Sequence, residues 1–166
     1  MDFINYIGYY GPVILILVNI YALSQYPQHL YLYLPFLFMN DIIFNPALKV
    51  LIKDPRPIGY QKSIGIDKDN IYINAHIYGM PSGHAQMVFY STTFLYLSLR
   101  NMNVLYFCLA VSLLTVSQRV VFNYHTPLQV IVGAIVGICM GYLIYYIARN
   151  KIVGRITEKL DDFAAV

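Results

Sequence analysis

Five long apolar segments account for most of this chain of 166 residues. A helix needs about 20 residues to cross the ~30 Å hydrocarbon core of a bilayer, and each segment has roughly that length. Because irregular backbone is not tolerated in hydrocarbon, each segment is predicted to be a membrane-spanning helix. The predicted spans are Phe3–Ser24, Leu30–Ile52, Ser82–Leu99, Asn103–Val121 and Thr126–Ala148. Pro35 and Pro46 predict kinks in the second span.

Composition supports the same class of fold. Charged residues make up 11% of the chain and hydrophobic residues 58%, whereas a soluble domain usually carries about 25% charged residues. The net charge of +3 is small, and no basic run indicates a nucleic-acid partner. We therefore predict an all-α, polytopic membrane helical bundle that forms a single domain over residues 1–166. Its core is expected at 30–148, followed by a tail at 149–166.

The two cysteines, Cys108 and Cys139, both fall within apolar segments. A disulfide framework or a metal site built on them is therefore not expected. No cluster of aspartate and histidine has the spacing of metal ligands either. The chain is accordingly expected to act without a metal or another cofactor.

Polar residues gather at three places, each at the end of an apolar segment. The clusters are Lys49 with Arg56-Pro57, then Pro81-Ser82-Gly83-His84, then Arg119 with His125. A charge at the centre of a membrane helix costs about 2.5–3.5 kcal/mol, so cations gathered at span ends call for a function. Counting the spans places all three clusters on the same side of the membrane. All of them carry groups that bind or attack phosphate.

The first two clusters each have a structural alternative. Lys49 and Arg56 would share one face of a continuous helix, although the neighbouring prolines argue against continuity. Both could instead extend from a membrane end towards water. Ser82 is predicted to be the N-cap of the third span, with Gly83 and free backbone amides beside it as an anion site. His84 then lies in the first turn; the alternative is a plain cap with an interfacial histidine.

The third cluster leads directly into the fifth span. Thr126 is predicted to be the N-cap, Pro127 the first helical residue, and Gln129 the partner that completes a capping box. Gln129 has two possible roles, which the sequence leaves open. It could cap the helix, which is worth about 1 kcal/mol, or it could accept a hydrogen bond from His125 and fix the tautomer of that ring.

Two further patterns are interpreted as structural. Glycines spaced by four in the fifth span indicate close approach of another helix. They are Gly133, Gly137 and Gly141. Asp41 lies in the second span near Asn40 and Asn45, and these three are predicted to form an interior hydrogen-bonding patch.

Basic residues on the opposite side of the membrane indicate orientation. They are Arg100, Arg149, Lys151, Arg155 and Lys159, whereas Lys53, Lys62 and Lys68 on the cluster side count against them. By the positive-inside rule we predict a cytosolic tail and clusters that face the lumen or the cell exterior. The first segment is expected to remain as a signal anchor. The tail over Asn150–Phe163 is either an amphipathic interfacial helix or a frayed terminus.

Together these residues resemble the type 2 phosphatidic acid phosphatase superfamily of membrane lipid phosphatases. The pattern of that family is K-x6-R-P, then P-S-G-H, then S-R-x5-H-x3-D. Here the elements are Lys49 to Pro57, Pro81 to His84, and Arg119 to His125, with Ser117-Gln118 before Arg119 and Gln129 in place of aspartate. The stretches around Asn45–Lys49, Lys53–Pro57, Tyr78–Gln86 and Tyr124–Val130 look like the dolichyl diphosphatase branch, which also has this glutamine.

The resemblance implies a metal-independent mechanism with a covalent intermediate. His125 would attack phosphorus and form a phosphohistidine, oriented by Gln129. His84 would give its proton to the leaving group and later act as the base for water. The phosphoryl oxygens would be held by Lys49, Arg56, Ser82, Gly83 and Arg119.

The expected function is therefore hydrolysis of a polyprenyl or dolichyl diphosphate at the lumenal ends of the helices. Three alternatives stay open: a phosphatidate phosphatase, a non-catalytic lipid-binding member, and a headgroup transferase. The expected partners are the bilayer and a lipid phosphate, without nucleic acid; the oligomeric state is left open. The expected location is the endoplasmic reticulum or another endomembrane, or the plasma membrane in a prokaryote.

Overall fold

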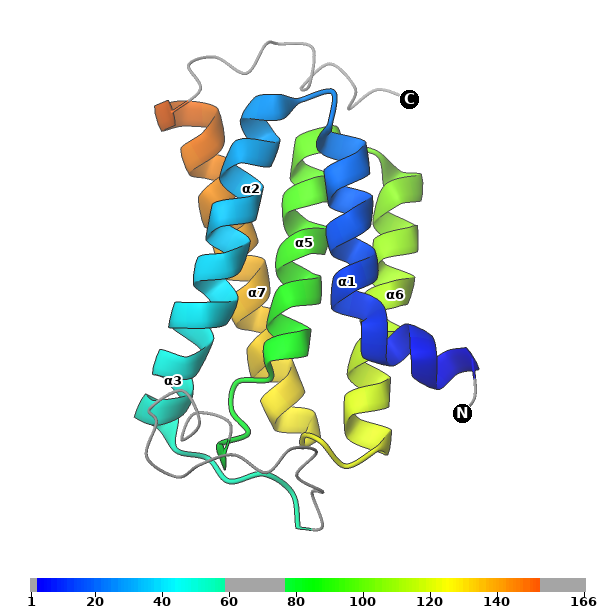
Figure 1. Cartoon of the computed structure of the whole chain (residues 1–166), viewed down its shortest axis with the longest axis vertical. Coiled ribbons are helices and arrows are strands. Elements are labelled where there is room, and N and C mark those ends of the chain that lie inside the picture. Colours follow the sequence, from blue (N-terminus) through cyan, green and yellow to red (C-terminus); the bar gives the residue numbers. More distant parts are fainter. Residues whose placement is uncertain (1–2, 59–76, 153–166) are drawn as a thin grey trace.

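The computed structural model describes residues 3–58 and 77–152 as a bundle of helices (Figure 1). In chain order the elements are α1 (Phe3–Leu23), α2 (Pro27–Met39), the π-helical η1 (Asn40–Phe44), α3 (Asn45–Ile52), α5 (Gly83–Leu99), α6 (Met102–Val121), α7 (Pro127–Ile147) and the π-helical η2 (Ala148–Ile152). Within the described ranges there is no strand, only an isolated bridge between Pro55 and Tyr78. The predicted all-α membrane bundle is confirmed.

Four helical stretches in the described part are long and apolar enough to cross a membrane: Asn5–Leu23, Pro27–Ile52, Met102–Val121 and Pro127–Asn150. The third predicted span, Ser82–Leu99, corresponds to α5, which has 17 residues and carries several polar side chains. Its polar side chains pair with neighbouring helices inside the bundle. The hydroxyls of Ser91 and Tyr33 are 2.7 Å apart, those of Thr92 and Ser112 2.9 Å apart, and Ser98 lies 2.9 Å from His29 Nδ1.

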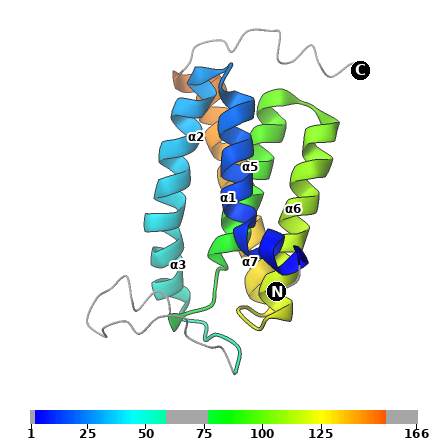
Figure 2. The ribbon, with the colours of Figure 1, turned by 45° about the vertical axis from the view of Figure 1, so that its right-hand side comes forward.

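Helix α5 is the central element of the bundle. It packs most extensively on α7 and also contacts α1, α6 and α2. Figures 1 and 2 show it enclosed by these helices from both viewing directions. The C-terminal ends of α3 and α6 and the N-terminal ends of α5 and α7 all lie at the lower end of the bundle in Figure 1. The segments that carry the three polar clusters therefore meet at one end.

The second predicted span is three consecutive elements rather than one regular helix. The Asn45 N–H bonds to the Asn40 carbonyl, five residues back, which is the π-helical pattern. Pro46 follows directly and has no N–H to donate, so the widened turn accommodates it. Helix α2 runs through Pro35. At the other end, Lys53 adopts a left-handed conformation (φ 55°) and ends α3.

The predicted close approach at the glycine stripe is confirmed, and the partner is α5. A Cβ on Gly133 would lie 2.6 Å from the Ser82 carbonyl oxygen, and one on Gly141 would lie 2.9 Å from that of Tyr90. A Cβ on Gly137 would collide with the Gln86 carbonyl oxygen. The absence of side chains lets the two backbones touch, and this contact fixes α7 against the helix that begins with Ser82.

Gly137→Ala is expected to destabilise the fold by about 1–3 kcal/mol, because the new methyl group meets backbone rather than a movable side chain. Thermal unfolding of the purified protein in detergent measures this. Ile135→Ala, at a position 54% exposed on the same helix, is the control and should change stability by about 0.5 kcal/mol or less. A Gly137→Ala variant as stable as wild type would show that the helices are not in close contact.

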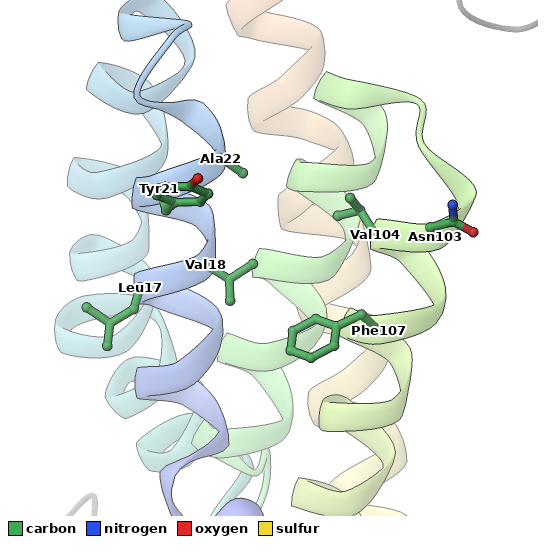
Figure 3. A pocket seen from close by; sticks show the side chains of 7 residues that line it. All are labelled: Leu17, Val18, Tyr21, Ala22, Asn103, Val104 and Phe107. Atoms are coloured by element: carbon green, nitrogen blue, oxygen red, sulfur yellow. The ribbon is translucent and has the colours of Figure 1, made fainter.

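An apolar groove of about 580 Å³ lies between α1 and α6 (Figure 3). Val18 and Ala22 of α1 face Val104 and Phe107 of α6 across it, while the Leu17 side chain points away from α6 in this view. The groove is near the C-terminal end of α1 and the N-terminal end of α6. That is the end of the bundle opposite to the polar clusters, and its lining suits hydrocarbon rather than phosphate.

Candidate active site

Charged and polar side chains are buried together where α3, α5, α6 and α7 meet. Lys49 in the last turn of α3 and Arg119 in the last turn of α6 are each 5% exposed. Ser82, the N-cap of α5, is fully buried, and His125 in the loop before α7 is 5% exposed. Arg56 is the third cation at this place. The charges of Lys49, Arg56 and Arg119 all act on His84, which is also close to His125.

The segment after α3 carries Arg56 to the loop between α6 and α7. The Arg56 Nη1 group donates to the Tyr124 carbonyl oxygen at 3.0 Å and lies 3.4 Å from His125 Nε2. The backbone N–H groups of Tyr124 and His125 both donate to the Arg119 carbonyl oxygen, at 3.0 and 3.1 Å. Lys49 and Arg56 thus reach the same site without lying on one continuous helix.

The capping box predicted at the start of α7 is confirmed. Gln129 N–H donates to the Thr126 hydroxyl at 3.2 Å, and Gln129 Oε1 accepts from the Thr126 N–H at 3.1 Å. The same Oε1 atom lies 3.2 Å from His125 Nδ1. The capping contact and the contact with the imidazole, which the sequence presents as alternatives, are therefore made by one oxygen at the same time.

The other end of the Gln129 amide fixes the tautomer of His125. Nε2 of Gln129 lies 2.5 Å from Asp54 Oδ2 and 2.8 Å from the Pro55 carbonyl oxygen, and both of these are acceptors. The NH₂ group must therefore point to them, which leaves Oε1 to face His125. Nδ1 of His125 then carries the proton, and Nε2 presents its lone pair towards Arg56.

Asp54 was not among the residues predicted for this site. It lies 75 positions before Gln129, and no local pattern in the sequence indicates that contact. The backbone brings it there: Gly79 N–H donates to the Asp54 carbonyl oxygen at 2.8 Å, beside the bridge between Pro55 and Tyr78. Any side chain on Gly79 would collide with the amide of Gln129, so glycine at this position admits that amide.

The Arg119 guanidinium lies between two tyrosine rings. Its Cζ is 5.1 Å from the centroid of Tyr9 and 4.8 Å from that of Tyr124, within the range of cation–π attraction. Tyr9 also lies against His84, with ring centroids 6.3 Å apart. The first turns of α1 point away from the rest of that helix (Figure 1), and Pro12 lies just beyond them.

Tyr9 was also missed by the sequence interpretation. The available signal is the tyrosine spacing at the start of α1, since Tyr6, Tyr9 and Tyr10 share one face of a helix. Together with Asn5 they line a cavity of about 300 Å³, and Tyr9 links this wall to Arg119. A first helix that lies outside all three motifs therefore contributes to the wall of the site.

A chain of amides fixes the start of α5. Asn45 Nδ2 donates to the Pro81 carbonyl oxygen (3.2 Å) and to Gln86 Oε1 (2.8 Å), while Gln86 Nε2 donates to Asn40 Oδ1 (2.6 Å). The predicted interior patch is therefore confirmed for Asn40 and Asn45. It is wrong for Asp41, whose side chain is exposed because the π-helical turn carries it off the buried face.

Ser82 and Gly83 stand at the N-terminus of α5. Ser82 has the extended conformation of an N-cap, as predicted, but its side chain makes no capping bond. Its hydroxyl is buried and has no hydrogen-bond partner in the described part of the chain. Gly83 faces Asn45, since a Cβ there would lie 3.3 Å from Asn45 Oδ1. A buried hydroxyl next to open helix amides is an arrangement that suits an anion.

Burial lowers the pKa of His125 to about 3, with further lowering by Arg56, Lys49 and Arg119; the hydrogen bond with Gln129 opposes this shift. The ring is therefore neutral across the physiological pH range, and its Nε2 can act as a nucleophile without first losing a proton. The same cations that disfavour a charged imidazole favour a bound phosphate.

The described residues contain no group of three or more His, Cys, Asp or Glu side chains that could hold a metal ion. Cys108 is buried in α6 and Cys139 is exposed on α7. Most of the polar stretch from Lys53 to Met80, and most of the predicted tail over Asn150–Phe163, fall at 59–76 and 153–166, outside the described residues.

Residues 30–152 match the protein-family model described as "PAP2 superfamily". The dolichyldiphosphatase of Saccharomyces cerevisiae (strain ATCC 204508 / S288c) is 39% identical over 119 residues, which are 66% of this chain and 47% of that protein. Dolichyldiphosphatase 1 of Dictyostelium discoideum is 27% identical over 112 residues, which are 61% of this chain and 44% of that protein. The aligned part is thus less than half the length of either relative, and no solved structure matches. Because the matched range contains all three polar clusters, the chain belongs to the PAP2 superfamily.

Proposed function

We propose that this protein is a membrane-integral phosphatase that hydrolyses a polyprenyl or dolichyl diphosphate through a phosphohistidine. The observation that carries the proposal is the position of His125. Its Nε2 lone pair faces Arg56, and its Nδ1 proton is held by Gln129. The names of the two relatives support a lipid diphosphate as the substrate.

The chemistry requires two displacements at phosphorus. In the first, His125 Nε2 forms a bond to the terminal phosphorus while the bond to the leaving oxygen breaks. His84, protonated once the anionic diphosphate offsets the surrounding cations, gives that oxygen its proton. The leaving group is then the lipid monophosphate. In the second, water attacks the phosphorus, His84 takes a proton from it, and the nitrogen–phosphorus bond breaks. Inorganic phosphate leaves, and both histidines return to their starting states.

The remaining site residues are proposed to stabilise the phosphoryl group. Lys49, Arg56 and Arg119 supply positive charge, and the Ser82 hydroxyl with the Gly83 amide supplies neutral donors. Because Lys49, Arg119 and Ser82 are already buried at the site before substrate binds, little reorganisation accompanies the reaction. Charge that builds up on the equatorial oxygens in the transition state therefore meets donors already in position.

The site is proposed to face the lumen of an endomembrane, or the exterior of a prokaryotic cell, and the tail from 149 the cytosol. The whole chain would then act as one domain, with residues 30–148 as its core. The orientation rests on the basic residues beyond the opposite helix ends, Arg100 and Arg149 among them.

A substrate panel tests the proposed function. The purified protein in detergent would be given a polyprenyl diphosphate, the matching monophosphate and phosphatidate, with released phosphate as the readout. We expect the diphosphate to be preferred. A preference for phosphatidate would support the monoester alternative, while binding without release would support a lipid-binding protein. Transfer of phosphate to an added alcohol would identify a headgroup transferase.

Vanadate is expected to inhibit, and EDTA is expected to leave activity unchanged. A trigonal-bipyramidal vanadate resembles the transition state and should bind the cations around His125 at about micromolar concentration, as transition-state mimics bind tightly. Steady-state rates with each compound measure this. Activity that is lost in EDTA and restored by magnesium would contradict the proposed side-chain mechanism.

A further inference from the structure

We propose that Asp54 is a positioning residue for His125 and acts on it through the amide of Gln129. We call this connection, from Asp54 through Gln129 to His125, the amide relay. The inference rests on the proposed function, because it assigns a role in the step that His125 carries out. It concerns a variable position within the first motif, between Lys49 and Arg56, which the fold brings to the attacking histidine.

The surroundings of Gln129 select one orientation of its amide. Gln129 could present either end of its amide to His125 if its surroundings were indifferent. The surroundings favour one orientation, however. Rotating the amide by 180° would place Oε1 against both Asp54 Oδ2 and the Pro55 carbonyl oxygen, which lie 2.5 and 2.8 Å from Nε2. An acceptor facing two acceptors is unfavourable, so Asp54 and Pro55 together select the orientation in which Oε1 receives the His125 proton.

Asp54 also supplies a negative charge near His125. When Nε2 of His125 bonds to phosphorus while Nδ1 keeps its proton, the imidazole becomes positively charged. A neutral amide orients this ring but carries no net charge to stabilise it. The Asp54 carboxylate is hydrogen-bonded to the far end of the same amide and polarises Oε1. Its negative charge is separated from the imidazole only by the Gln129 amide. The carboxylate expected at position 129 in the wider family is thus supplied from position 54.

The surrounding backbone holds Asp54 in place. Its carbonyl oxygen accepts the Gly79 N–H at 2.8 Å, and Gly79 itself leaves room for the Gln129 amide. Only two carboxylates occur among the described residues, Asp41 and Asp54. Asp41 is exposed on η1. Within this part of the chain, Asp54 is the carboxylate that is hydrogen-bonded to Gln129, the residue in contact with His125 Nδ1.

A double-mutant cycle tests the proposal, using Asp54→Asn, Gln129→Glu and the two combined. Asp54→Asn keeps an oxygen that can accept from Gln129 Nε2 but removes the charge, so kcat should fall about tenfold while KM changes little. Gln129→Glu alone sets two carboxylates against each other and should lower kcat further. In the double variant the amide introduced at position 54 donates to the carboxylate introduced at position 129, and kcat should exceed that of Gln129→Glu.

The pH profile provides a readout that a merely structural role would not move. The charged groups facing His125 are Arg56, Lys49 and Arg119, with His84 nearby, and all are unchanged in the cycle. In the double variant a carboxylate contacts His125 directly and raises its pKa. The neutral attacking form then exists only above a higher pH, so the acid limb of kcat/KM should move upward.

Thr126→Ala is the matched control. It removes the hydroxyl that caps Gln129 N–H but leaves the backbone N–H that donates to Gln129 Oε1. The midpoint of thermal unfolding should fall, while the pH profile should stay that of wild type. A shifted pH profile in Thr126→Ala would mean that capping alone controls the titration of His125, and the amide relay would be wrong.

Nitrogen-15 NMR of the histidine rings tests the geometric argument without a substrate. Wild type should show the Nδ1-protonated tautomer at His125, and Asp54→Ala should show a mixture. Wild-type kcat in Asp54→Asn, effects that multiply in the double variant, or an unchanged tautomer in Asp54→Ala would each overturn the amide relay. Failure of the wild type to release phosphate from any lipid would instead overturn the proposed function, and the NMR result would still decide the amide relay.

Discussion

His125→Ala should abolish turnover of every lipid phosphate while leaving the bundle folded. Without the nucleophile no covalent route remains, and loss of such a residue costs on the order of 10⁴-fold or more in rate. The fold should survive because the loop is held by backbone bonds, from the N–H groups of residues 124 and 125 to the Arg119 carbonyl oxygen. Thermal unfolding of the variant beside wild type checks that point.

Trapping of the intermediate identifies the nucleophile itself. Wild type quenched during turnover of a ³²P-labelled substrate should carry label that is stable in base and labile in acid, as expected for a nitrogen–phosphorus bond. Peptide mapping should place it at His125 rather than His84 or His29, and His125→Ala should carry none. Label on a serine or an aspartate would overturn the assignment.

The second large effect is expected for His84→Ala. General acid–base catalysis usually contributes about 10²- to 10⁴-fold, so hydrolysis of a lipid diphosphate should fall by that range. The loss should depend on the leaving group, since an aryl phosphate needs little help from an acid. With such a substrate the first displacement should proceed, whereas hydrolysis of the phosphohistidine, which needs the base, should remain slow.

Labelled enzyme should therefore accumulate in His84→Ala when the leaving group is good. Rapid quenching during turnover of an activated aryl phosphate measures the labelled fraction, with wild type as the reference. Tyr9→Phe keeps the ring that lies against His84 and Arg119 and serves as the control, with little change expected. Equal rates for aryl and lipid substrates in His84→Ala, without accumulated label, would assign the proton transfer to another group.

The ends of the helices could be predicted closely because their signals are local. Thr126-Pro127 with Gln129 marks the start of α7, and the predicted span Thr126–Ala148 differs from the observed helix, Pro127–Ile147, by one residue at each end. One such signal was overlooked: Asn101 caps α6, accepting from the N–H groups of Asn103 and Val104 at 2.9 and 3.2 Å.

Features that depend on distant parts of the chain could not be predicted in this way. Asp54 meets Gln129 across 75 positions, and Tyr9 reaches Arg119 from a helix that carries none of the motifs. The polar side chains of α5 are also explained only by residues far away in the sequence. Ser91, Thr92 and Ser98 lower its hydropathy, and only their partners on neighbouring helices explain why a helix at the centre of a membrane bundle can contain them.

The crowding of the Gln129 amide against Gly79 and Asp54 also restricts the evolutionary routes open to this site. A mutation to carboxylate at position 129 meets Asp54, and any side chain at position 79 meets the amide. We therefore expect epistasis, in which a carboxylate at position 129 is more harmful while Asp54 keeps its charge than after position 54 has become neutral. Lineages that exchanged glutamine for aspartate here should have passed through a neutral residue at 54 first, and reconstructed ancestral sequences of the family can test that order.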